Sequence, residues 1–214
     1  MGEENSQKPT GLMQPFFRFV RRVVIIFTYP LYRVRIEGSE NIPESGPFVL
    51  ASNHKSMMDP VWITRGMKHL QLWAMGKEEL FKVPVLGWIL RKVGAYPVSR
   101  GSGDTSAMDA AKDIIERGCV LLIFPEGHRS KTDELLPVKS GIGLICAETG
   151  ASVLPVSIYF KGKLRFWKKV VVRYGEMIPS DAFTFSTPLK SKERKEASRY
   201  IMRKITELYE KGFE

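Results

Sequence analysis

The sequence predicts an α/β fold, with a largely parallel or mixed central sheet flanked by helices. Short apolar runs alternate with segments of helical periodicity along most of the chain, which is the order typical of such folds. The run at 119–124 is apolar throughout, as expected of a strand buried on both faces. The 214 residues contain no internal repeat and no long linker, so we expect a single domain.

The N-terminal part differs in composition from the rest. Residues 1–10 are polar and are predicted to be a disordered leader. Residues 11–32 mix aromatic and aliphatic side chains with three arginines. This mixture fits a helix at a membrane interface, with cations near the headgroups and rings below them. It fits equally a terminal helix packed on the core. The predicted α/β domain is 33–214.

The first half of that domain is expected to contain four strands and two helices. Glycine and proline bound the first two strands, as is common at turns, and a proline begins each helix, a favoured position for it. The strands are expected at 33–37, 48–52, 70–74 and 95–98, and the helices at 60–68 and 84–92.

The second half is expected to contain three helices and three strands. Alanine and isoleucine recur at helical spacing before Gly118, which marks a helix end. The last helix is amphipathic through Ala197, Ile201 and Ile205. The helices are expected at 104–117, 140–148 and 191–211, and the strands at 119–124, 152–159 and 169–174.

Composition narrows the classes of partner and site. The net charge of +10 favours anionic partners, such as a membrane surface, nucleic acid or phosphorylated substrates, although charge alone does not choose among them. Cys119 and Cys146 lie in apolar runs without CxxC spacing and are expected to be buried, reduced thiols. No histidine has ligand spacing to a cysteine, so no metal site is predicted. No apolar run reaches the roughly 18 residues of a membrane span.

A candidate catalytic pair follows the strand expected at 48–52. Side chains at strand ends in α/β sheets commonly line a ligand crevice. His54 is the candidate general base, and Asp59 is the carboxylate that would fix its tautomer. Positions five apart lie about 140° apart on an unbroken helix, so this pairing needs a helix that starts between or after them. Asp59 as N-cap and Pro60 as first helical residue would provide it.

The same spacing has a second interpretation. His128 also precedes an aspartate, Asp133, by five residues. Asp59 can be only a helix cap, and His54 only a polar residue in a turn.

A second polar segment follows the strand expected at 119–124. Gly127 permits a tight turn, Arg129 can bind a phosphate through two parallel hydrogen bonds, and Ser130 can donate another. Glu126 would orient Arg129 or accept a hydroxyl proton. The alternative is a surface turn with a local Glu/Arg pair, which contributes little energy.

Further cations lie at the ends of predicted elements. Arg100 follows the strand expected at 95–98, where it suits a phosphate clamp. Lys139 precedes a helix, whose N-terminus favours anions. Each can also be a solvated surface residue. Residues 161–173 carry six basic residues and no acid, interleaved with aromatic rings. That pattern fits a membrane interface, single-stranded nucleic acid or a basic hairpin.

Together these segments resemble the glycerolipid acyltransferase family, in particular the 1-acyl-glycerol-3-phosphate acyltransferases. The family's first motif, Asn-His-x-Ser-x-x-Asp, is matched at 53–59. Its third, Phe-Pro-Glu-Gly-Thr-Arg-Ser, is matched at 124–130 with His128 in place of threonine. The second motif is matched loosely at 94–100, and the fourth at 153–156. The resemblance spans roughly 38–174 in the family's order.

The resemblance implies acyl transfer from a fatty acyl thioester to the sn-2 hydroxyl of lysophosphatidic acid, giving phosphatidic acid. His54 would be the general base, oriented by Asp59. The implied substrate-binding residues are Asn53, Ser56, Arg100, Glu126, Gly127, Arg129, Ser130 and Lys139. It implies no bound cofactor and no metal, since acyl-CoA or an acyl carrier protein serves as co-substrate. It implies a peripheral or monotopic position at the cytoplasmic face of a membrane.

The expected partners are therefore a membrane surface, a lysophospholipid and, as a candidate, an acyl carrier protein, but not nucleic acid. Two alternatives stay open. One is acyl transfer to glycerol-3-phosphate or another lysophospholipid. The other is a non-catalytic protein that binds lipid surfaces.

Overall fold

The fold was determined as a computed structural model that describes residues 15–98 and 105–214. A seven-stranded sheet forms its centre, in the order β1-β7-β6-β2-β5-β3-β4. All neighbouring strands are parallel except β6 and β7, which are antiparallel. The predicted mixed α/β fold is therefore confirmed. The predicted leader at 1–10 and the candidate Arg100 lie outside the described residues.

The elements follow the expected order with small shifts in their bounds. The strands are β1 (Tyr32–Glu37), β2 (Phe48–Ser52), β3 (Leu72–Lys77), β4 (Ala95–Val98), β5 (Val120–Ile123), β6 (Val153–Tyr159) and β7 (Lys168–Tyr174). The helices are α1 (Pro15–Thr28), α2 (Asp59–Gly66), α3 (Glu78–Phe81), α4 (Pro84–Lys92), α5 (Thr105–Glu116), α6 (Gly141–Thr149) and α7 (Ser191–Glu210). The short helix α3 is the one that the sequence pattern did not predict.

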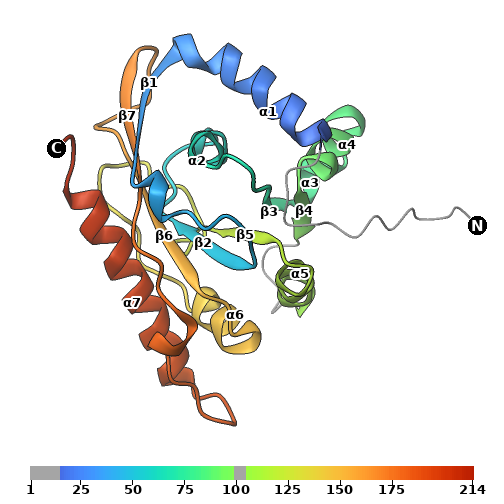
Figure 1. The fold of residues 1–214 in the computed structure, drawn as a ribbon, viewed down its shortest axis with the longest axis vertical. Coiled ribbons are helices and arrows are strands. Elements are labelled where there is room, and N and C mark those ends of the chain that lie inside the picture. The colour runs from blue at the N-terminus through green and yellow to red at the C-terminus, as the bar shows by residue number, and fades with distance from the viewer. Residues whose placement is uncertain (1–14, 99–104) are drawn as a thin grey trace, which may run out of the picture.

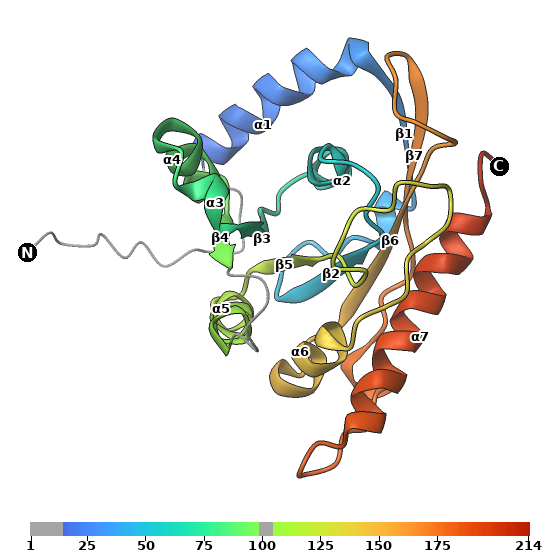
Figure 2. The same cartoon turned by 180° about the vertical axis from the view of Figure 1, so that it is seen from behind.

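Two apolar layers cover the two faces of the sheet. Alternate residues of β2 point to opposite sides, so Phe48 and Leu50 join the cluster with α2 and β7, whereas Val49 and Ala51 join that with α5, α6 and α7. Figures 1 and 2 show α1 and α2 on one side of the sheet and α5, α6 and α7 on the other. The strand predicted at 119–124 is buried over nearly its whole length, as expected.

Helix α1 crosses outside α2 and contributes little to the core. Only Phe17 of α1 is buried. At one end of the helix Phe16 meets the edge of Trp88 in α4, with ring centroids 5.4 Å apart. Beyond its other end, the backbone N–H of Trp167 donates to Leu31 O at 2.8 Å. Within the described residues no helix has both the length and the apolar character needed to cross a bilayer.

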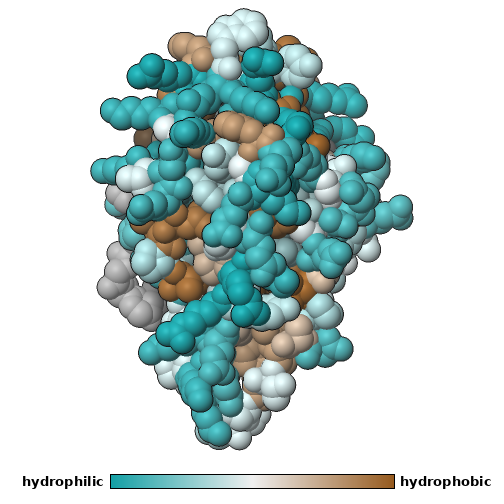
Figure 3. Space-filling model, turned by 90° about the vertical axis from the view of Figure 1, so that its left-hand side faces the viewer, coloured by the Kyte–Doolittle hydropathy of each residue, from teal (hydrophilic) through white to brown (hydrophobic). Residues whose placement is uncertain are grey.

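The face that carries α7 has a different character. In Figure 3 hydrophilic side chains predominate across it, with hydrophobic patches between them. Cys119 and Cys146 are buried thiols, as predicted.

Candidate active site

The two motif segments meet because β2 and β5 are parallel neighbours. Ala51 pairs with Ile123, so both chains leave the sheet at the same edge. The segments are then bonded to each other. Ser130 N–H donates to His54 O at 2.7 Å, and His54 N–H donates to Glu126 Oε1 at 2.8 Å. The structure thus brings residues 53–59 and 124–130 into one site.

His54 and Asp59 are hydrogen-bonded side chain to side chain. Nδ1 of His54 lies 2.8 Å from Oδ2 of Asp59. The Asp59 side chain is fully buried, while 17% of the His54 side chain is exposed. An ionised carboxylate only accepts hydrogen bonds, so the contact fits the tautomer with the proton on Nδ1 and a lone pair on Nε2. The ring also stacks on Phe124, with centroids 3.9 Å apart and planes inclined by 14°. The imidazole is therefore held in one orientation.

The loop between the pair folds around the carboxylate. Asp59 Oδ2 also accepts the backbone N–H groups of Lys55 at 2.7 Å and Ser56 at 2.8 Å. Helix α2 begins at Asp59, with Met58 preceding it as the cap residue and no side-chain cap bond. The prediction that Asp59 is the N-cap was therefore wrong by one position. The prediction that the helix starts late enough to let the pair meet is confirmed.

Glu126 is buried beneath the site and bonded to the backbone. Its Oε1 accepts His54 N–H and its Oε2 accepts Leu136 N–H, both at 2.8 Å. Burial raises the pKa of this carboxyl, and the two N–H donors partly offset that rise. Only 2% of the residue is exposed. These two hydrogen bonds join the segments, and the expected contact of Glu126 with a substrate hydroxyl stays a prediction.

Three more side chains expected to bind substrate lie below the surface. Asn53 is fully buried, and its amide donates to Ile158 O at 3.0 Å and accepts from Ile158 N–H at 2.7 Å. Ser130 Oγ donates to Glu134 O at 2.6 Å, and Ser56 Oγ accepts Met58 N–H at 3.0 Å. Internal hydrogen bonds hold the buried side chains of Asn53 and Ser130, and substrate binding by these two residues stays a prediction. The bonded and largely buried Ser56 is likewise placed to order the loop.

The cationic residues stand at the surface of the turn after β5. Gly127 has φ of 73°, and a Cβ there would lie 2.9 Å from Lys139 Nζ. Lys139 therefore extends across this glycine, and its Nζ lies 3.3 Å from His128 Nε2. Arg129 is exposed. The turn thus presents Lys139, His128 and Arg129 to solvent beside the segment that is bonded to His54.

Two further residues, which were not among those expected to bind substrate, belong to this site. His128 contacts Lys139, and Lys55 inserts a buried ammonium behind the His54 loop. Lys55 stands at an unspecified position of the first motif, and His128 replaces the threonine of the motif at 124–130. The motifs therefore could not identify either residue. No group of three or more His, Cys, Asp or Glu side chains within residues 15–98 and 105–214 is arranged to hold a metal ion.

Comparison with known proteins gives consistent matches. A sequence model of the acyltransferase family matches residues 33–159. A 1-acyl-sn-glycerol-3-phosphate acyltransferase of Bacillus subtilis is 30% identical over 83% of this chain and 89% of its own length. A chloroplastic 1-acyl-sn-glycerol-3-phosphate acyltransferase of Arabidopsis thaliana is 32% identical over 70% of this chain and 42% of that protein.

Among solved structures, the crystal structure of the 1-acyl-sn-glycerophosphate acyltransferase PlsC from Thermotoga maritima is similar. Its TM-score is 0.68 at 30% identity, over 90% of this chain and 78% of that one. The chain spans less than half the length of the chloroplast relatives from Arabidopsis thaliana and Brassica napus, at 42% and 44%.

Proposed function

The chain belongs to the acyltransferase family, and from this premise we propose that it acylates the sn-2 hydroxyl of 1-acyl-glycerol-3-phosphate to give phosphatidic acid. The acyl donor is a fatty acyl thioester, either acyl-CoA or an acyl carrier protein. The observation that carries the proposal is the 2.8 Å hydrogen bond between His54 Nδ1 and Asp59 Oδ2 at the end of β2. The names of the similar proteins support the choice of acceptor.

The proposed reaction is a direct transfer. Nε2 of His54 removes the proton from the acceptor hydroxyl as its oxygen attacks the thioester carbonyl carbon. The buried carboxylate of Asp59 stabilises the imidazolium that forms. The tetrahedral intermediate then collapses, the carbon–sulfur bond breaks, and the thiolate leaves with the proton that His54 carried. No ester to the enzyme is required.

The acceptor's phosphate is proposed to bind at the turn after β5. Arg129 and Lys139 supply positive charge at the surface of the segment that is bonded to His54. Gly127 lets the chain turn without a side chain between Lys139 and the backbone. A ring N–H of His128 can donate a further hydrogen bond. We include Arg100 on its motif position alone.

An activity matrix tests this function. Purified protein is assayed with acyl-CoA and acyl carrier protein donors against 1-acyl-glycerol-3-phosphate, glycerol-3-phosphate and a lysophospholipid with a larger headgroup. We expect turnover with 1-acyl-glycerol-3-phosphate. Higher kcat/KM for another acceptor would replace the proposed substrate, and vesicle binding without thioester consumption would indicate a non-catalytic lipid binder.

His54→Ala tests the base within that matrix. Turnover should fall by about 10²- to 10⁴-fold, the usual contribution of a general base. The thermal midpoint should stay close to that of the unchanged protein, because the ring is partly exposed. In the same assay Arg129→Ala should mainly raise the acceptor KM. Full activity of His54→Ala would refute the mechanism.

We also propose that the enzyme acts as a peripheral or monotopic protein at the cytoplasmic face of a membrane. Large apolar side chains are exposed along α1, at α4 and in the loop before β7. They are Phe19, Ile26, Phe27, Val85, Trp88, Phe166 and Trp167. Contacts at both ends of α1 place these three segments along one edge of the molecule. Exposed apolar side chains on neighbouring segments support docking to lipid.

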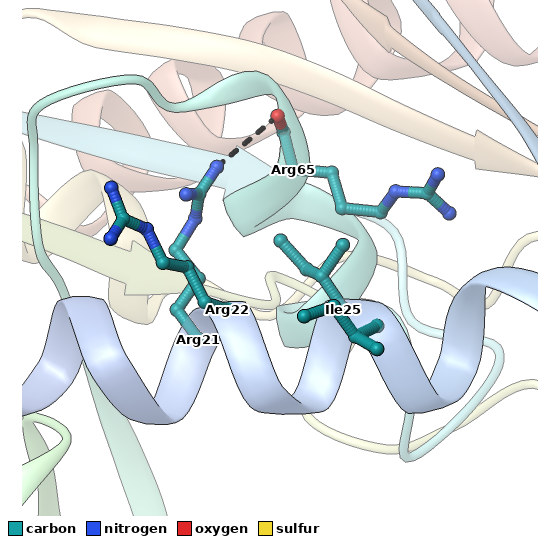
Figure 4. Close-up of a pocket in the computed structure, with 5 residues that line it drawn as sticks. Arg21, Arg22, Ile25 and Arg65 are labelled. Atoms are coloured by element: carbon teal, nitrogen blue, oxygen red, sulfur yellow. Dashed lines mark hydrogen bonds between the residues drawn. The ribbon is translucent and has the colours of Figure 1, made fainter.

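Cations accompany that apolar edge. Arg21, Arg22 and Arg65 line a hollow of about 360 Å³ between α1 and α2, together with Ile25 and Ile26 (Figure 4). Arg21 Nε donates to Thr64 O at 2.8 Å. Burial lowers the pKa of the Arg21 and Arg65 side chains, and neighbouring arginine charges lower that of Arg21 further. An anionic headgroup would relieve this crowding of like charges, which supports a membrane with anionic lipids as partner.

A further inference from the structure

Lys55 occupies an unusual place beside the proposed base. Its backbone N–H donates to Asp59 Oδ2 at 2.7 Å, on the side of the catalytic pair. Its side chain is bonded to other segments and is only 3% exposed. Lysine is seldom buried unless its charge is paired and its protons are bonded, so the surroundings of this ammonium require an explanation.

The ammonium group finds three oxygens, one for each of its protons. Nζ lies 2.8 Å from Phe160 O, 3.0 Å from Asp133 Oδ1 and 3.0 Å from the Tyr209 hydroxyl oxygen. It also lies over the ring of Phe160, 4.5 Å from the centroid, and 5.5 Å from that of Tyr209. The carboxylate of Asp133 balances the charge, and the hydrogen bond from Lys55 lowers the pKa of that carboxyl.

These three oxygens come from three separate parts of the fold. Phe160 follows β6, Asp133 belongs to the segment after the motif at 124–130, and Tyr209 lies in the last turn of α7. The three parts are also joined to each other. Tyr209 donates from its hydroxyl to Asp133 O at 2.8 Å, and Gly162 N–H donates to Asp133 Oδ1 at 2.7 Å. Lys55 is the point at which the His54 loop enters this network.

The residues before and after His54 in the sequence are therefore both fixed by hydrogen bonds. Before it, the amide of Asn53 is bonded twice to the backbone of Ile158. After it, the side chain of Lys55 is bonded to three distant segments. With the ring stacked on Phe124, little freedom remains for the imidazole to leave Asp59. A displacement of about 1 Å at a reacting group can cost about 10²-fold in rate.

We propose that Lys55 is a positioning residue, which fixes the His54–Asp59 pair by tying its loop to the segment around Asp133 and to the C-terminal helix α7. The inference rests on the proposed function for its effect on turnover. The geometric part does not, because the effect of Lys55 on the His54–Asp59 hydrogen bond can be measured whatever reaction the site performs.

Lys55→Met tests the proposal, because methionine keeps most of the side-chain length and removes the ammonium group. We expect kcat, normalised to folded protein, to fall by about 10- to 100-fold with the acceptor KM unchanged. Lys131→Met, at an exposed lysine of the neighbouring segment, is the matched control and should retain full turnover.

A second readout follows the pair directly. The proton on His54 Nδ1, bonded to Asp59, should give a downfield resonance in the ¹H NMR spectrum of the unchanged protein. That resonance should broaden or shift in Lys55→Met and stay in place in Lys131→Met. If Lys55 only stabilises the fold, the thermal midpoint will fall while normalised kcat and the resonance stay unchanged, and that result would overturn the proposal.

If Lys55→Met does not fold, Tyr209→Phe is the variant that tests the proposal. It removes one acceptor of the ammonium and keeps the ring. We expect the same direction of change in kcat and in the resonance, at smaller amplitude. Unchanged values in Tyr209→Phe would exclude the coupling to α7. If His54→Ala keeps full activity, the proposed mechanism fails, while the resonance still decides whether Lys55 orders the loop.

Discussion

At the scale of single residues, the buried polar side chains of this site mostly bind backbone. Hydrogen bonds to main-chain groups hold the side chains of Asn53, Glu126 and Ser130. Removing such a partner leaves a buried group unsatisfied, which costs about 1–3 kcal/mol. Short motifs around an active site thus include residues that build its frame as well as those that face the substrate.

Titration of Glu126 makes the stability of the protein depend on pH. Its pKa in the folded protein is raised by burial above the ordinary value of 4.5. A raised pKa means that the folded state binds this proton more tightly than the unfolded state. The stability that this raised pKa contributes is fully present when the pH is below the ordinary pKa. It is lost as the pH rises through the raised pKa of the folded protein.

Glu126→Gln removes that titration. We expect the free energy of unfolding of the unchanged protein, minus that of Glu126→Gln, to decrease between pH 4 and pH 7. Urea denaturation at fixed pH steps measures both. Glu40→Gln, at an exposed carboxyl, should show no such trend. A difference that stays constant or grows with pH would contradict the account of Glu126.

At the scale of elements, α6 and α7 pack closely because Gly143 lacks a side chain. Gly143 N–H donates to Ser198 Oγ at 3.0 Å, and that hydroxyl donates to Arg194 O at 2.9 Å. A Cβ on Gly143 would lie 2.1 Å from Arg194 O and 2.7 Å from Ser198 Oγ. The close approach holds α7 against the sheet, where its last turn carries Tyr209.

Gly143→Ala should therefore destabilise the protein. The added methyl group meets backbone that cannot move aside, and overpacking of this kind costs about 1–3 kcal/mol. Gly141→Ala is a matched control in the same helix, since a Cβ there meets nothing within 4 Å. We expect it to be neutral or to stabilise by up to ~1 kcal/mol. Urea denaturation compares the two, and equal effects would contradict the packing argument.

At the scale of the whole molecule, the surface has two sides. The apolar edge runs from α4 along α1 to the loop before β7, whereas hydrophilic side chains predominate on the α7 side (Figure 3). The net charge of +10 adds an attraction to anionic surfaces. These features together support one orientation on a membrane, with the α1 edge toward lipid.

Two substitutions on α1 separate the apolar and ionic parts of docking. The protein should sediment with phosphatidylcholine vesicles that contain phosphatidylglycerol. Phe27→Ser removes a ring that is 72% exposed and should weaken binding about tenfold or more at any salt concentration. Arg22→Gln should weaken binding several-fold at low salt and little at 1 M salt, because screening removes its contribution.

Lys192→Gln on α7 is the control for charge, with a side chain that is 85% exposed. It should leave vesicle binding close to that of the unchanged protein. If it weakens binding as much as Arg22→Gln, the attraction comes from net charge alone and the proposed orientation is wrong. If the protein does not bind these vesicles at all, the membrane proposal fails.

The sequence by itself determined the fold class, the order of the elements and the two segments that form the site. Hydrophobic periodicity and turn residues are local properties, so strands and helices could be placed within a few residues. The requirement that α2 start late enough for His54 to meet Asp59 also followed from local geometry. The exact start at Asp59, one residue before the predicted one, depended on hydrogen bonds that spacing does not reveal.

Only the tertiary structure decided which motif residues are exposed and which are buried. Asn53 and Glu126 find their partners at Ile158 and at Leu136, positions that no local pattern connects to them. Lys55 stands at the unspecified position after the histidine of the first motif, and its proposed role depends on contacts with Asp133, Phe160 and Tyr209. Burial and hydrogen bonding are set by segments far apart in the chain, and for that reason motif spacing could indicate the chemistry but not the supporting contacts.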